Sequence, residues 1–171
     1  ADHKSDEVMA RLPKAPAQKN GKKVALIGAG PASLTVANDL MPLGYEVTIF
    51  EKFDRPGGLM RVNIPSFRLP RDIIDREVAG LVDLGVHIET DKVVGRTFTV
   101  HDLLTSRGFD AVFLGVGAGA PSFLGIPGEN AGRVISANEF LTRVNLMGGD
   151  RFPDIDTPVG IGTDVVVIGA G

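Results

Sequence analysis

The chain has no cysteine, no tryptophan and a single tyrosine, and aromatic residues make up only 6% of its 171 residues. Without cysteine, this segment alone can form no disulfide, no thiolate nucleophile and no iron–sulfur or zinc site built from thiolates. Any metal cluster would have to lie on further sequence or on a partner. Few aromatic residues together with 22 glycines favour an α/β sheet with glycine turns over an aromatic-rich β-sandwich.

An excess of charge of one sign is also lacking, because 18 Lys and Arg oppose 21 Asp and Glu, for a net charge of −3. This balance provides no general attraction for nucleic acid or anionic lipid, so we expect neither as a partner. No apolar run approaches the ~20 residues of a membrane-spanning helix, and the N-terminus lacks the apolar centre of a secretory signal. We expect a soluble, cytoplasmic protein with a sizeable core.

A strand–helix–strand unit is predicted over residues 23–50. Residues 24–27 form a short apolar run, which is typical of a strand buried on both faces. Pro31 suits the first position of a helix whose apolar residues recur at helical spacing, and residues 46–50 form the second strand. Glu51 follows at the carboxyl end of that strand. The order matches the dinucleotide-binding βαβ unit of α/β proteins.

The turn before the helix reads Gly-Ala-Gly-Pro-Ala-Ser, which matches the G-x-G-x-x-G fingerprint at Gly28 and Gly30 and places Ser33 third. Gly28 permits a tight turn, Gly30 lets backbone approach a pyrophosphate, and Ser33 is small enough for close packing. Free N–H groups and the helix dipole would hold the phosphates at the helix N-terminus. Glu51 lies about 20 residues after Gly30, the spacing of an acid that binds ribose hydroxyls and repels a 2′-phosphate. We therefore expect a dinucleotide other than NADP in this first site.

Two further glycine turns favour a cofactor longer than NAD. Gly57 and Gly58 follow Glu51 closely, and the turn Gly115-Val116-Gly117 follows a strand predicted over residues 110–114. All three turns would lie at the carboxyl edge of the sheet, where ligands of open α/β folds bind. A simple NAD dehydrogenase has no evident need for the Gly57–Gly58 turn, whereas FAD requires a second backbone approach beyond its pyrophosphate. From the residues alone, an NAD-dependent dehydrogenase domain and an ordinary turn at these glycines stay open as alternatives.

The remaining pattern completes a doubly wound, mainly parallel, Rossmann-like α/β sheet. We expect helices over about 70–84 and 101–106, strands over 86–89 and 110–114, a small antiparallel pair at 92–94 and 98–100, and a helix from a capping box at Ser136 to about 146. The charged residues between 71 and 77 are interpreted as a solvated helix face.

Residues 164–171 repeat the apolar run and glycine turn of residues 23–30. The repeat predicts a second nucleotide-binding unit that breaks off after its first strand, so we expect the chain to be a fragment. The predicted organisation is a flexible arm over 1–22, an FAD-binding domain over 23–148, a linker over 149–163 and the first strand of a truncated NAD(P)-binding domain over 164–171.

Several stretches resemble the FAD-binding part of the glutamate synthase small (beta) subunit and its relatives. They are GKKVALIGAGPAS, EKFDRPGGLMRVNIPSFRLPRDII, DAVFLGVGAG, ANEFLTRVNLM and DTPVGIGTDVVVIGAG. The relatives include the NADPH-dependent ferredoxin oxidoreductases and the flavin segment of dihydropyrimidine dehydrogenase. The similarity extends from Gly21 to the last residue, and IPSFRLP after GGL is specific to this group among flavoproteins.

The resemblance implies a set of FAD contacts. The implied cofactor-binding residues are Gly28, Gly30, Pro31, Ala32, Glu51, Lys52, Gly57, Gly58, Leu59, Arg68, Val94 and Gly117. Residues 28–32 would hold the pyrophosphate, Glu51 the adenosine ribose, and residues 52–59 the remainder of the dinucleotide towards the flavin. Arg68 matches an arginine that contacts FAD, Val94 a position beside the adenine, and Gly117 a turn near the cofactor.

The resemblance also implies an NAD(P)H-dependent flavin oxidoreductase. A second domain would bind NAD(P)H, and electrons would pass through FAD to iron–sulfur clusters on missing sequence or on a partner, such as a large glutamate synthase-like subunit. No catalytic acid or base is expected, because the flavin carries the chemistry, and no metal site is expected in this segment. Members of the group carry cysteine clusters upstream of the flavin motif and this chain has none, so we expect the segment alone to be inactive. The alternatives are a cofactor-holding or docking module without turnover and a dihydropyrimidine dehydrogenase-like flavin segment.

Overall fold

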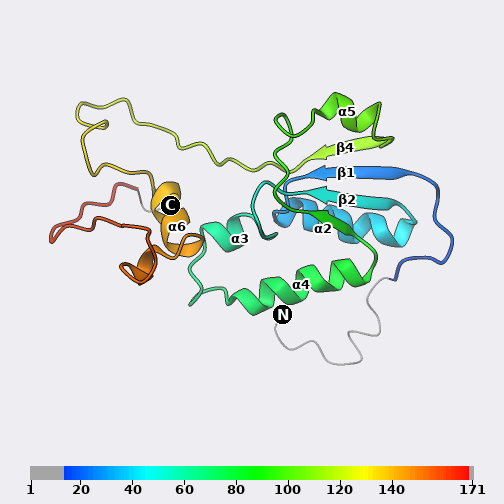
Figure 1. Cartoon of the computed structure of the whole chain (residues 1–171), viewed down its shortest axis with the longest axis horizontal. Helices are drawn as coiled ribbons and strands as arrows, with labels where there is room; N and C mark the ends of the chain where they lie inside the picture. Colours follow the sequence, from blue (N-terminus) through cyan, green and yellow to red (C-terminus); the bar gives the residue numbers. More distant parts are fainter. Residues whose placement is uncertain (1–13, 170–171) are drawn as a thin grey trace. The chain divides into compact units, whose positions relative to one another are not determined.

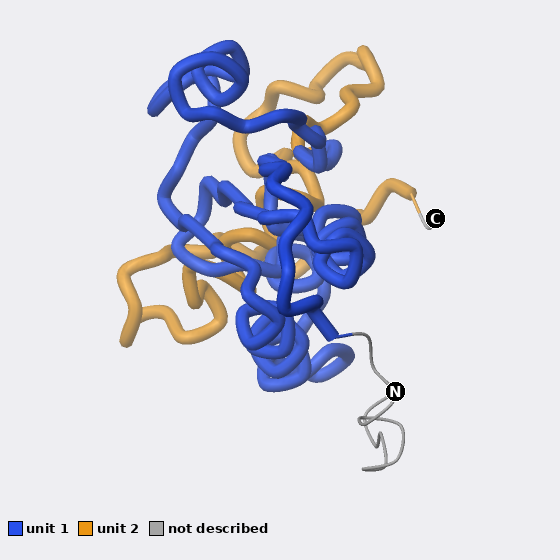
Figure 2. The backbone as a smooth tube through the Cα atoms, turned by 90° about the vertical axis from the view of Figure 1, so that its right-hand side faces the viewer, with its two compact units in different colours: residues 1–118 blue, residues 119–171 orange. Residues whose placement is uncertain are grey.

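The computed structural model describes residues 14–169 and divides the chain into two compact units, one up to residue 118 and one from residue 119 (Figure 2). The predicted FAD-binding domain, 23–148, thus includes most of the first unit and part of the second. Among the described residues, no helix is long and apolar enough to cross a membrane.

The first unit is built on a four-stranded parallel sheet of order β3-β2-β1-β4. The strands are β1 (Lys23–Ile27), β2 (Glu46–Phe50), β3 (His87–Glu89) and β4 (Ala111–Leu114). β1 is central, because Val24 is in register with Val47 of β2 and with Ala111 of β4. This order matches the first four strands of the Rossmann order 3-2-1-4-5-6, so the predicted fold class is confirmed.

Five α-helices and two short 3₁₀ helices belong to the described residues. They are α2 (Pro31–Leu40), η1 (Met41–Leu43), α3 (Leu59–Val62), α4 (Arg71–Asp83), α5 (Val100–Leu104), α6 (Ala137–Asn145) and η2 (Gly149–Arg151). Pro31 takes the first position of α2 as predicted, and Gly44, with φ of 83°, ends the turn of η1. Ser136 caps α6 as predicted, its Oγ accepting a hydrogen bond from the Glu139 N–H at 3.1 Å.

The two faces of the sheet pack against different elements (Figure 1). On one face, the fully buried Leu26 and Ile49 belong to a cluster that also contains residues of α2 and α4. On the other face, Phe50 packs edge-to-face on Phe98 at 5.0 Å between ring centroids and shares a cluster with Leu103 of α5. Strand residues therefore alternate between two apolar faces, as a doubly covered parallel sheet requires.

Two local predictions were wrong, and one short helix was not predicted. Residues 92–94 and 98–100 form no antiparallel pair, since the structure has one parallel bridge there, between Val94 and Phe98. The helix that was not predicted is α3, which is too short for an apolar period to show in the sequence. Residues 164–169 are in no strand, and their apolar side chains from Val165 to Ile168 are 64–87% exposed. A strand needs a neighbour to pair with, and residues 170–171 lie outside the described residues.

The segment before β1 is tied to the sheet by backbone and side-chain contacts. The Asn20 N–H donates to the Gly44 carbonyl at 2.9 Å. Asp110 accepts hydrogen bonds from the Lys22 Nζ and the Lys23 N–H, both at 2.8 Å. These bonds hold the pKa of Asp110 below its ordinary value, and Asp110 in turn raises the pKa of Lys22. Of the predicted arm over 1–22, residues 1–13 lie outside the described residues.

The second unit is organised around α6. Arg143 near the end of this helix pairs with Glu139, one turn earlier, at 2.8 Å. The same guanidinium donates to the Pro158 carbonyl at 3.3 Å, which ties the chain after η2 to the helix. These contacts give residues 119–169 local structure that composition alone did not indicate.

Candidate dinucleotide-binding site

The centre of the site is the turn that joins β1 to α2. At Gly28, φ is 91° and a Cβ would lie 2.5 Å from the Gly115 carbonyl oxygen, so the fold itself requires glycine. Gly30 differs, because its φ is −80° and a Cβ there would meet nothing within 4 Å. The backbone conformation does not require glycine at position 30, and the space beside Gly30 is open. This arrangement is expected where a pyrophosphate approaches the chain.

α2 starts at this turn with free N–H groups. Its N-cap, Gly30, provides no side-chain hydrogen bond, and Pro31 has no N–H to donate. The first helical bond runs from the Leu34 N–H to the Gly30 carbonyl at 3.0 Å. The N–H groups of Ala32 and Ser33 therefore precede the helical ladder, and with the helix dipole they favour an anion.

Glu51 reaches the same turn from the end of β2. The residue is 3% exposed, and its carboxylate oxygens accept hydrogen bonds from the Ala29 N–H at 2.6 Å and the Phe53 N–H at 2.9 Å. Each carboxylate oxygen retains a second lone pair that can accept a hydroxyl hydrogen. The carboxylate lies against the glycine turn, which is the position that the sequence spacing predicts for a group that binds ribose.

The Gly57–Gly58 turn packs backbone to backbone on the first glycine turn. The Gly57 N–H donates to the Ala29 carbonyl at 2.9 Å. A Cβ on Gly58 would lie 2.7 Å from the Gly30 Cα, and φ is 127° at Gly57 and 51° at Gly58. Neither position accepts a side chain without movement of the backbone. The structure therefore brings these two glycine turns together.

At the end of β4, Gly115 and not Gly117 meets the first turn. A Cβ on Gly115 would lie 2.1 Å from Ser33 Oγ, whereas a Cβ on Gly117 would meet nothing within 4 Å. Ser33 is fully buried, and its hydroxyl has no hydrogen-bond partner among the described residues. Sequence reasoning did not select Gly115 as a site residue. The available signal was Ser33, which is larger than the usual glycine and needs a facing residue without a Cβ.

The other residues implied by the resemblance surround this centre at different depths. Lys52 is exposed, and its Nζ lies 4.7 Å from the centre of the Phe53 ring. Leu59, the first residue of α3, is 58% exposed. Arg68 is exposed as well, and its side chain makes no hydrogen bond or ion pair within residues 14–169.

Val94 lies on the side of the sheet end that carries Glu51. The Lys92 N–H donates to the Glu51 carbonyl at 2.8 Å, so the segment that contains Lys92 and Val94 lies beside the end of β2. Val94 is half-buried and packs against the cluster that contains Phe50. The structure thus places Val94 two residues from a direct backbone contact with Glu51.

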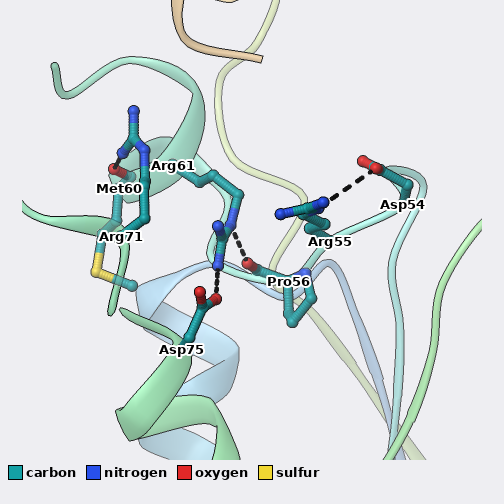
Figure 3. A network of polar contacts seen from close by, with 7 residues as sticks. All are labelled: Asp54, Arg55, Pro56, Met60, Arg61, Arg71 and Asp75. Atoms are coloured by element: carbon teal, nitrogen blue, oxygen red, sulfur yellow. Dashed lines mark hydrogen bonds and ion pairs between the residues drawn. The ribbon is translucent and has the colours of Figure 1, made fainter. Parts of the chain in front are cut away.

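Sequence reasoning missed Arg61, which binds the carbonyl of Pro56, the residue before the Gly57–Gly58 turn (Figure 3). The residue is 4% exposed, its Nε donates to the Pro56 carbonyl at 2.8 Å, and its Nη2 pairs with Asp75 of α4. Every residue has a backbone carbonyl, so the sequence contains no signal for the hydrogen bond from Arg61 to the Pro56 carbonyl.

The charged residues between 71 and 77 are exposed as predicted at positions 72, 75, 76 and 77, and Arg71 is the exception because it is partly buried. Its guanidinium donates to the carbonyls of Met60 at 2.8 Å and Ile64 at 2.9 Å, so it anchors the preceding loop to α4 (Figure 3). Partial burial and, to a smaller extent, the nearby Arg61 lower the pKa of Arg71. Arg71 therefore holds the segment that follows the second glycine turn, at Met60 and Ile64.

The parallel sheet, the glycine turn and the carboxylate together define a Rossmann-type domain of the dinucleotide-binding class. A comparison with family models matches residues 22–171 to pyridine nucleotide-disulphide oxidoreductases. The chain belongs to the pyridine nucleotide-disulphide oxidoreductase family.

Curated relatives match most of the chain. The NADP(+)-dependent formate dehydrogenase subunit beta of Moorella thermoacetica is 44% identical over 154 residues, which cover 89% of this chain and 20% of that protein. The NAD-dependent dihydropyrimidine dehydrogenase subunit PreT of Salmonella typhimurium is 38% identical, over 91% of this chain and 35% of that protein. The glutamate synthase (NADPH) small chain of Bacillus subtilis is 37% identical, over 93% of this chain and 32% of that protein. The predicted resemblance is confirmed, and the chain spans about a fifth to a third of these relatives.

A solved structure agrees with the fold. FprA of Mycobacterium tuberculosis, in complex with NADPH, matches with a TM-score of 0.65 and 25% sequence identity. The match covers 71% of this chain and 28% of FprA. The similarity supports the Rossmann-like architecture found in the first unit.

Proposed function

We propose that this chain is the FAD-binding portion of an NAD(P)H-dependent oxidoreductase of the glutamate synthase small-subunit type. The observation that carries the proposal is the open space at Gly30, bordered by the free N–H groups of α2 and by the Glu51 carboxylate. Family membership and the relatives' names support an oxidoreductase that uses a nicotinamide nucleotide. When bound, a flavin supplies the capacity to accept a hydride and to release electrons singly.

The adenosine diphosphate half of the cofactor is assigned to the first glycine turn. The N–H groups of Ala32 and Ser33 donate to the pyrophosphate, which lies against Gly30. Glu51 accepts hydrogen bonds from the ribose hydroxyls with the lone pairs that Ala29 and Phe53 leave free. Because this carboxylate is buried and negatively charged, it also excludes a 2′-phosphate from the site.

The remaining contacts follow from the surroundings of this turn. Gly57 and Gly58 supply bare backbone beyond the pyrophosphate, and Lys52 and Leu59 border it. Arg68 has a guanidinium without a partner in the described part of the chain, which suits a phosphate or a ring edge. The two outer positions of the proposed site are Val94, on the adenine side, and Gly117.

The second half of the reaction is assigned to sequence that follows the first unit. The sequence of residues 164–171 repeats that of residues 23–30, which supports a second nucleotide-binding unit for NAD(P)H. Several relatives are named as subunits or small chains, which supports a partner, for example a large glutamate synthase-like subunit. Because this segment has no cysteine, we assign iron–sulfur clusters to that partner or to other sequence. The similarity to PreT favours a dihydropyrimidine dehydrogenase-type subunit as the second candidate.

A titration of the purified protein with FAD tests the proposal. We expect one FAD per chain, seen as quenched flavin fluorescence and a shifted visible spectrum. Anaerobic NADH or NADPH should then bleach the flavin band of the full-length protein. Saturable binding of NAD in place of FAD would contradict the proposal, and bound FAD that neither nucleotide bleaches would leave a cofactor-holding module as the function.

A further inference from the structure

We propose that Arg61 is a positioning residue that holds the Gly57–Gly58 turn in place for cofactor binding. The inference rests on the proposed FAD site and concerns a residue that contacts neither the first glycine turn nor the proposed ligand space directly. It acts through the Pro56 carbonyl, to which its Nε donates (Figure 3), and so on the backbone of residues 56–58 that precedes α3.

The burial of Arg61 is unusual for a charged side chain. Its side chain is 5% exposed, although arginine is rarely buried unless paired. Its ionic partner, Asp75, is 60% exposed, so solvent screens the attraction and the pair alone contributes little stability. The pair instead fixes the plane of the guanidinium, and this orientation aims Nε at the Pro56 carbonyl at 2.8 Å.

Arg61 also lies directly against Gly57. A Cβ on Gly57 would be 3.3 Å from the Arg61 Cβ and 3.4 Å from its Nε. On its other side, the Gly57 N–H donates to the Ala29 carbonyl at 2.9 Å. A continuous set of contacts therefore runs from Asp75 of α4, through Arg61 and Gly57, to the turn between β1 and α2.

Backbone hydrogen bonds hold the turn at Gly57 and Gly58, whose carbonyls accept from N–H groups of α3, and the Arg61 Nε adds the bond at Pro56. Residues 51–58 form neither helix nor strand, and two adjacent glycines lose more conformational entropy on ordering than other residues. A turn that is ordered before the ligand arrives does not have to be ordered by binding. Arg61 thus preorganises the wall of the proposed site beside Gly30.

Arg71 provides a matched control. It is an arginine of the same network and also donates to two backbone carbonyls, those of Met60 and Ile64. Those carbonyls lie after Gly58 in the chain, and no hydrogen bond joins Arg71 to Pro56 among the described residues. Loss of Arg71 should loosen the end of α3 and leave the Gly57 contact intact.

The test compares Arg61→Met, Asp75→Asn and Arg71→Met with the unsubstituted full-length protein. Methionine keeps much of the volume of the arginine side chain. Asp75→Asn is a milder change at an exposed carboxylate, so it keeps the test possible if Arg61→Met does not fold. Two quantities are measured: hydrogen exchange of the Gly57 amide without FAD, and the FAD dissociation constant. The exchange arm requires neither cofactor nor activity.

We expect exchange of the Gly57 amide to accelerate about tenfold or more in Arg61→Met, and FAD binding to weaken by about tenfold or more, as for the loss of a hydrogen bond from a charged donor. Asp75→Asn should shift both in the same direction by less, and Arg71→Met should change neither by more than about threefold. Unchanged Gly57 exchange in Arg61→Met, or equal effects in Arg71→Met, would overturn the positioning role while the FAD site stands. Absence of FAD binding by the unsubstituted protein would instead overturn the proposed function, and the role of Arg61 with it.

Discussion

Replacement of Gly30 by alanine separates what the fold requires from what a bound cofactor requires. The backbone at Gly30 has φ of −80° and ψ of 178°, which any residue adopts, and a Cβ would meet nothing within 4 Å. The folded protein should therefore tolerate the methyl group. Lower entropy of the unfolded chain should raise the free energy of unfolding by about 0.4–1 kcal/mol.

The same methyl group should oppose FAD, because it would occupy the space assigned to the pyrophosphate. Overpacking of one methyl group costs about 1–3 kcal/mol. At 1.4 kcal/mol per tenfold change, the dissociation constant for FAD should rise about 5- to 150-fold. Fluorescence titration with FAD measures the binding, and urea denaturation of the same preparation measures the stability.

Two glycines serve as controls for this substitution. A Cβ on Gly80, within α4, would also meet nothing within 4 Å, so Gly80→Ala should stabilise the protein and leave FAD binding unchanged. Gly28→Ala should destabilise it, because φ is 91° and the Gly115 carbonyl oxygen lies 2.5 Å from the new Cβ. If Gly30→Ala binds FAD as tightly as the unsubstituted protein, or unfolds as readily as Gly28→Ala, the assignment of this turn to the pyrophosphate is refuted.

Two further predictions concern packing and pH. Gly115→Ala should lower the free energy of unfolding by about 1–3 kcal/mol, because its Cβ would lie 2.1 Å from Ser33 Oγ, and the added change Ser33→Gly should restore most of it in urea denaturation. Hydrogen bonds from the Lys22 side chain and the Lys23 N–H lower the pKa of Asp110 in the folded state. The stability that Asp110 contributes is therefore fully present above the pKa of the unfolded state, near 3.8, and is lost as the pH falls through the lower folded pKa. Stability curves measured against pH should therefore fall less steeply below about pH 4 in Asp110→Asn.

Each of these two predictions has an outcome that contradicts its physical reason. Additive effects of the changes at Gly115 and Ser33 would show that the two residues do not share one space. An Asp110→Asn protein whose stability falls with pH as steeply as before would mean that other carboxylates determine the acid limb.

Local patterns predicted the elements well, because their cause is local. The apolar run of β1, the proline at the start of α2 and the apolar period of α4 each follow from a single element, and Ile74, Val78 and Leu81 form the buried face of α4. The position of Glu51 against the first glycine turn also followed from spacing, because parallel strands end at the same edge.

Features that depend on two distant segments were not predicted. Gly115 is required by Ser33, which lies on another element, so its sequence context did not distinguish it from Gly117. Arg61 binds a backbone carbonyl, which every residue offers, so its partner cannot be read from side-chain types. Residues 164–169 repeat the pattern of β1 but are in no strand, because a strand also requires a pairing partner.

The most direct measurement is a crystal structure of the protein with bound FAD. The proposed binding mode predicts pyrophosphate oxygens within about 2.7–3.2 Å of the Ala32 and Ser33 nitrogens, with the adenosine ribose hydroxyls on the Glu51 carboxylate. A pyrophosphate bound away from Gly30, or a Glu51 carboxylate turned from the ribose, would contradict it.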